Sequence, residues 1–130
     1  MNRSRDWWIQ AQADLRHAQR ALGDGDYDWA CFAAHQASEK ALKAVFEQRR
    51  QKVWGHSVTR LLQALQDEGV AVSADLVDAA KMLDKHYIPA RYPNGLEQGA
   101  PTEFYTLKEA ENAIRDSEEI LRFADHLLGG

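Results

Sequence analysis

The chain has 130 residues, of which 45% are hydrophobic and 28% charged, with a formal net charge of −4. This balance is typical of one soluble globular domain, expected to span residues 1–130, and it argues against a general nucleic-acid coat. The single cysteine excludes an intrachain disulfide, and the absence of a signal peptide and of a long apolar stretch predicts a cytoplasmic protein that does not contact membranes.

The first predicted helix covers residues 4–22, where apolar side chains recur at steps of three and four. Ser4 is the expected N-cap, and the Gly-Asp-Gly sequence at residues 23–25 predicts a tight turn. After so short a connection, a second helix should run back antiparallel to the first. It is capped by Asp24 or Asp26 and extends to about Arg50.

Residues 29–46 of this second helix, reading WACFAAHQASEKALKAVF, are the predicted centre of the fold. Small and apolar side chains occur on nearly every side, which is typical of a buried central helix. Four polar side chains interrupt them, at Gln36, Glu39, Lys40 and Lys43. Such a polar strip must face a partner, a ligand or another buried polar group.

A third, shorter helix is predicted at residues 57–68, and Ser73 caps a fourth whose buried stripe reaches Tyr87. Two prolines end the fourth helix, and a loop then continues to about residue 105. Thr106 and Glu109 form a capping box, which opens a last helix with Leu107 in its buried stripe. We therefore predict an all-α, antiparallel up-and-down bundle of four main helices plus a short fifth helix.

Charge is unevenly placed along the chain. Residues 40–60 hold six basic side chains and one acidic one, whereas residues 97–126 hold eight acidic and three basic ones. The basic stretch could bind phosphate or an acidic partner, or the two stretches could attract each other across the surface.

His35 and Glu39 are four residues apart on one predicted helix, a spacing that helical metal sites use. No third ligand stands at a recognisable spacing, so an intrahelical hydrogen bond or ion pair is favoured. Cys31 lies among apolar residues and is interpreted as a buried, inert thiol. The sequence accordingly predicts neither a metal nor another cofactor.

Two groups of residues could bind a nucleotide. Gln36, Lys40 and Lys43 follow one another at steps of four and three, and could hold phosphate and read a base, or could form ordinary salt bridges. Tyr87, Arg91 and Tyr92 lie on a stretch stiffened by proline. Their rings and guanidinium could stack on and clamp a nucleotide, or could anchor the loop to the bundle.

Three stretches, ACFAAHQASEKALKAVF, GHSVTRLL and LDKHYIPARYPN, resemble the HEPN (higher eukaryotes and prokaryotes nucleotide-binding) domain family in residue types and in order. The likeness extends over almost the whole chain and is greatest to small stand-alone prokaryotic members. It implies a helical bundle that forms homodimers and works with a minimal nucleotidyltransferase, as in a toxin–antitoxin pair. It also implies a nucleotide site that includes Gln36, Glu39, Lys40, Lys43, His56, Tyr87, Arg91 and Tyr92.

Many members of this family are metal-independent ribonucleases with an Arg followed at short spacing by a polar residue and a His. Here Arg49 or Arg50 with His56 gives a formal match, but in the loop before the third helix and without the usual polar residue. The resemblance therefore favours a module that binds nucleotide or RNA over an enzyme. The alternatives are a ribonuclease toxin, with His56 as base and Arg50 or Arg91 stabilising the phosphorane, and a protein-interaction module without a nucleotide site.

Overall fold

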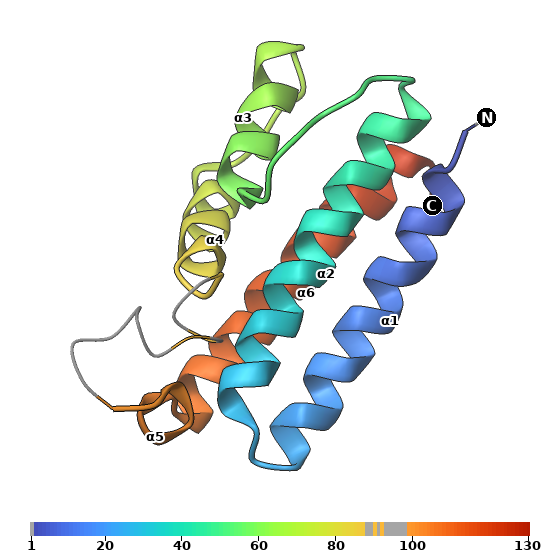
Figure 1. Cartoon of the computed structure of the whole chain (residues 1–130). Coiled ribbons are helices and arrows are strands. Elements are labelled where there is room, and N and C mark those ends of the chain that lie inside the picture. Colours follow the sequence, from blue (N-terminus) through green and yellow to red (C-terminus); the bar gives the residue numbers. More distant parts are fainter. Residues whose placement is uncertain (1, 88–89, 91, 93–98) are drawn as a thin grey trace.

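Long helices run side by side through the molecule, as Figure 1 shows for α1, α2 and α6. The computed structural model describes residues 2–87, 90, 92 and 99–130. These residues form α1 (Ser4–Gly23), α2 (Tyr27–Gln48), α3 (Val58–Asp67), α4 (Ala74–Asp84), α5 (Pro101–Phe104) and α6 (Leu107–Leu128). They contain no strand, which confirms the prediction of an all-α bundle.

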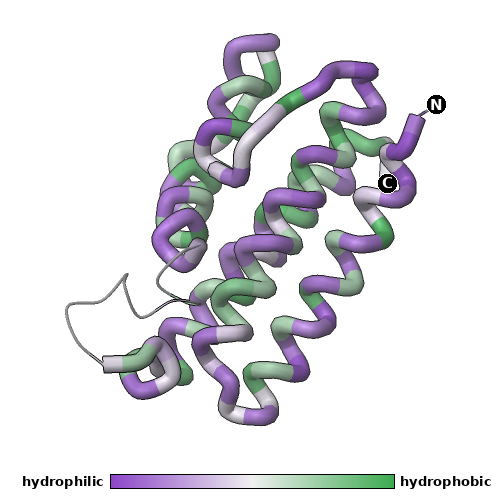
Figure 2. The backbone as a smooth tube through the Cα atoms, viewed as in Figure 1, coloured by the Kyte–Doolittle hydropathy of each residue, from purple (hydrophilic) through white to green (hydrophobic). Residues whose placement is uncertain are grey.

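Helix α2 is the centre of the bundle and contacts α1, α3, α4, α5 and α6. Most of its residues are buried, and Ala34, Ala37 and Ala41 are completely inaccessible to solvent. Side chains this small let neighbouring helices approach closely, with α1 on one side and α3 and α4 on the other (Figure 1). In Figure 2 hydrophobic and hydrophilic residues recur along α1, α2 and α6, which is the pattern of amphipathic helices.

Several predicted helix ends are confirmed in the structure. The Ser73 hydroxyl accepts a hydrogen bond from the amide of Leu76 at 3.1 Å, so Ser73 caps α4. Thr106 and Glu109 form the predicted capping box of α6. None of the helices in the described part of the chain is both long and apolar enough to cross a membrane.

Three local predictions were wrong. Arg3, not Ser4, is the N-cap residue of α1, because the Ser4 hydroxyl donates instead to the carbonyl oxygen of Ala44, 2.9 Å away on α2. Leu107 is 46% exposed, since it is the first residue of α6 and projects beyond the core. The loop predicted to reach residue 105 contains the additional helix α5, which begins at Pro101, where a missing amide hydrogen costs nothing.

Candidate functional site

Asp84, the last residue of α4, joins three helices through one carboxylate. It accepts hydrogen bonds from the amides of Val58 at 2.8 Å and Thr59 at 3.0 Å, and from the Ser57 hydroxyl at 2.9 Å. These donors belong to the start of α3, where unpaired amides and the helix dipole favour a negative charge. His35 of α2 adds a fourth donor, with its Nε2 3.1 Å from the carboxylate.

The proton positions follow from the charge of Asp84. Burial alone would raise the pKa of this carboxyl, but hydrogen bonds from His35, Thr59 and Val58 outweigh it and lower the pKa to about 2. An ionised carboxylate only accepts hydrogen bonds, so Nε2 of His35 carries a proton. The other ring nitrogen, Nδ1, lies 3.1 Å from the side-chain oxygen of Gln36.

Glu39 holds an exposed histidine at the surface of the bundle. Its carboxylate, whose side chain is only 5% exposed, receives the Lys43 ammonium at 2.9 Å. The same carboxylate lies 3.2 Å from Nδ1 of His56, whose side chain is 57% exposed. Nδ1 therefore donates to Glu39, and Nε2 of His56 is the ring nitrogen that can exchange a proton with a ligand.

Tyr87 supports the ring of His56. The two rings are stacked, with centroids 4.9 Å apart and planes 16° from parallel. Tyr87 also contacts His35 and Phe32 of α2, at centroid distances of 5.2 and 6.2 Å. We call His35, Glu39, Lys43, His56, Asp84 and Tyr87 the polar cluster. It brings together an aromatic surface, a cation and a histidine that is held in place, which are the groups that stack on bases and pair with phosphate.

Other predicted site residues lie outside the polar cluster. Lys40 pairs with Asp14 of α1 at 2.6 Å, so its ammonium links α1 to α2. Tyr92 is described and half-exposed. Arg91 lies outside the described residues.

The arginines of the formal ribonuclease match are placed apart from each other. Arg49 pairs with Glu68 at 3.5 Å, just after α3. Arg50 has a left-handed backbone, with φ of 59°, and lines a surface hollow with Asn2 and Lys52.

The residues proposed as a metal pair do not bond to each other, because His35 turns to Asp84 while Glu39 turns to Lys43 and His56. Within the described residues there is no group of three side chains suited to hold a metal ion. Cys31 is completely buried, and burial raises the pKa of its thiol to about 12, in agreement with the interpretation as inert.

Sequence reasoning missed the part that Asp84 plays. The available signal was weak: an acid at the end of an amphipathic helix, followed by histidine and tyrosine. Nothing in the order of residues shows that this acid meets the start of α3, which lies more than 20 positions earlier in the chain.

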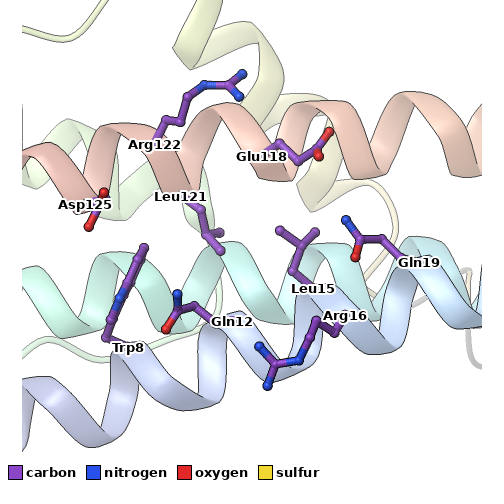
Figure 3. A pocket seen from close by; sticks show the side chains of 9 residues that line it. All are labelled: Trp8, Gln12, Leu15, Arg16, Gln19, Glu118, Leu121, Arg122 and Asp125. Carbon is purple, nitrogen blue, oxygen red and sulfur yellow. The ribbon is translucent and has the colours of Figure 1, made fainter. Parts of the chain in front are cut away.

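A separate groove of about 340 Å³ runs between α1 and α6. Figure 3 shows Leu15 and Leu121 pointing into the space between the two helices, with Trp8 farther along α1. Charged side chains of both signs surround them, including Arg16 and Glu118. None of the predicted site residues that the structure describes lines this groove.

Comparisons with known proteins show that a family model described as the HEPN domain matches residues 4–127. A crystal structure of TT1696 from Thermus thermophilus is 53% identical, with a TM-score of 0.94 over 98% of this chain and 99% of that one. An archaeal HEPN homologue, ST0689, is 36% identical, with a TM-score of 0.82 over 97% of this chain and 98% of that one.

A further solved relative is a HEPN domain protein, TM0613, from Thermotoga maritima, which is 37% identical with a TM-score of 0.79 and covers 95% of this chain and 98% of its own. A protein of Methanocaldococcus jannaschii named "Putative toxin MJ1304" is 27% identical over 92% of this chain and 84% of its own length. The family model and these relatives extend over nearly the whole chain. The chain therefore belongs to the HEPN domain family.

Proposed function

We propose that this HEPN-domain chain binds a nucleotide or a short RNA at the polar cluster. The observation that carries the proposal is the stacked pair of His56 and Tyr87, because it joins an exposed ring to a ring held by the bundle. A base stacks on such an aromatic surface whatever its sequence, since every base has a π-face.

Lys43 supplies the charge for a phosphate beside the stacked rings. Its ammonium has three N–H donors, and the structure gives one of them to Glu39. A phosphate oxygen can accept another without breaking the first bond. The basic stretch at residues 40–60 surrounds this lysine with further positive charge.

The proposal includes protein partners. We expect the chain to act as a homodimer together with a nucleotidyltransferase-type protein. The likeness to a protein named a putative toxin supports a counterpart that controls its activity.

The direct test is fluorescence anisotropy with a labelled single-stranded RNA of about six nucleotides, in low salt and then in rising salt. We expect saturable binding that weakens with salt, because phosphate contacts release counterions. Lys43→Ala combined with Arg91→Ala should reduce affinity at least tenfold. Lys108→Ala is the matched control, since it removes one exposed lysine from α6.

Equal affinity in the double variant and in the control would contradict the assignment of the site. If nucleotides and RNA neither bind nor raise the melting temperature, and Lys43→Ala only lowers stability, the chain is an interaction module whose polar cluster is structural.

One observation favours a second function, metal-independent RNA cleavage. Glu39 fixes Nδ1 of His56 and leaves Nε2 exposed, which is how a general base is oriented. His56 would take the proton of a ribose 2′-hydroxyl as that oxygen attacks the adjacent phosphorus. The 5′-oxygen would then leave with a proton from the histidine, while Lys43 stabilises the charge on the phosphorane. This function predicts RNA cleavage in EDTA that His56→Ala abolishes, and intact RNA after long incubation would contradict it.

A further inference from the structure

A hollow of about 130 Å³ opens beside Lys43, between α1 and the loop after α2. Trp7 of α1 and Trp54 of the loop both line it, together with Lys52. Trp54 is 87% exposed, the highest value among the large hydrophobic side chains in the described part of the chain. An indole this exposed contributes little to the core, so its position needs another explanation.

Lys43 joins the hollow to the polar cluster. Its ammonium is 2.9 Å from Glu39 and also lies over the Trp7 ring, 5.7 Å from the ring centroid. The cation therefore stands between the Glu39–His56 pair on one side and the indole of Trp7 on the other. A ligand that reached from one to the other would pass this ammonium.

The remaining surface of the hollow is polar. Glu47, Gln51 and Lys52 line it beside the two indoles. A protein-docking surface is expected to have a contiguous apolar centre, whereas two rings among lysines are typical of sites for single-stranded nucleic acid.

We infer that this hollow is a second base subsite, which takes a neighbouring nucleotide of the same single-stranded RNA; the inference rests on the proposed function. One base stacks on His56 and the next enters the hollow between Trp7 and Trp54. The phosphate between them lies against Lys43, and Lys52 is placed for the next phosphate. The ligand is thus an RNA of at least two nucleotides, and a mononucleotide fills only half of the site.

The test measures the affinity of AMP and of a six-nucleotide oligoadenylate for four purified proteins: the natural chain, Trp54→Ala, Trp54→Phe and Phe104→Ala. Phe104 is a half-exposed ring on α5, away from the loop after α2 in Figure 1, and is the matched control. Circular dichroism melts confirm that each variant is folded, which we expect for a residue as exposed as Trp54.

We expect Trp54→Ala to weaken oligoadenylate binding about fivefold or more, because loss of one stacked base costs about 1–3 kcal/mol. AMP affinity should stay the same, Trp54→Phe should restore most of the loss, and Phe104→Ala should bind both ligands normally. If the natural chain binds both ligands and Trp54→Ala binds the oligonucleotide equally well, the second subsite is wrong and the first survives.

Failure of the natural chain to bind either ligand would instead overturn the proposed function, and the second subsite with it. A Trp54→Ala variant that loses self-association in sedimentation but keeps its RNA affinity would identify the indole as a protein contact. That outcome also contradicts the inference.

Discussion

At the scale of single residues, Asp84 decides how α3 meets the rest of the bundle. One carboxylate satisfies two backbone amides and a hydroxyl at the start of α3 and also fixes the His35 ring. His35 in turn contacts Tyr87, on which His56 is stacked. The orientation of the exposed histidine therefore depends on a residue that no ligand needs to touch.

Replacing Asp84 with Asn should lower the free energy of unfolding by about 2 kcal/mol at pH 7, because uncharged amides pair less well with a helix N-terminus and cannot accept all four bonds. Asp78→Asn, at an exposed acid on the same helix, should have little effect. Urea denaturation measures both. Equal stability of the two variants would show that the Asp84 bonds do not contribute.

The same carboxylate predicts a loss of stability in acid. In the folded chain the pKa of Asp84 is about 2, below its ordinary value of 3.8. Its contribution is therefore complete above about pH 4 and disappears as the pH falls toward 2. The acid-induced loss of stability between these values should be smaller in Asp84→Asn than in the natural chain, and identical curves would contradict this prediction.

His86 predicts a second, milder pH dependence. It is 9% exposed and lies 3.1 Å from the Tyr105 hydroxyl, and burial is the main cause of the lowered pKa of its ring. A histidine that resists protonation when folded stabilises the fold above its ordinary pKa of 6.5, and that contribution is lost as the pH falls through the lower folded value. NMR titration should show the His86 ring titrating below pH 6.5; titration above it would be contradictory.

At the scale of the helices, the small side chains of α2 set how closely its neighbours pack. Ser38 adds a polar link to this part of α2: its hydroxyl donates to the Ala34 carbonyl and accepts from Ser117 of α6, both at 2.9 Å. Because both serines are completely buried, this bond fixes the register of α2 against α6.

Ala37→Leu should therefore cost about 1–3 kcal/mol of stability, since the added atoms have no space between the helices. Ala37 has no exposed surface, whereas Ala74 at the start of α4 is exposed. Ala74→Leu is thus the control and should melt near the natural chain. A similar melting temperature for both variants would mean that the α2 surface is loosely packed.

The helices of this fold were predictable because each has a signal within its own residues. The alanines of α2 and the capping box at Thr106 are patterns of neighbours three or four residues apart. The prediction for Ser4 was wrong because its hydroxyl bonds to Ala44, 40 positions away. Helix α5 has only four residues, too few for a period to appear.

The candidate site was predictable only in part, for the same reason. The i,i+4 pair of Glu39 and Lys43 is local and was expected from spacing. The stack of His56 on Tyr87 and the bond from His35 to Asp84 join residues on different helices and loops. Their proximity is a property of the bundle, and spacing along the chain contains no trace of it.

At the scale of the whole molecule, the net charge of −4 coexists with a basic stretch beside the polar cluster. This arrangement restricts RNA to one region and predicts strong salt dependence for a weakly acidic protein. The expected homodimer places two such regions in one particle. Sedimentation equilibrium at micromolar concentration should therefore give twice the mass of one chain, and a single-chain mass at all concentrations would contradict the dimer.

The most direct measurement of the central claim is an NMR titration of the natural chain with short single-stranded RNA, followed through the ring signals of His56 and Tyr87. We expect these two residues and the Lys43 side chain to show the largest, saturating changes, and the exposed His126 of α6 to show none. Saturating changes confined to the groove between α1 and α6, or no changes at all, would contradict a nucleotide site at the polar cluster.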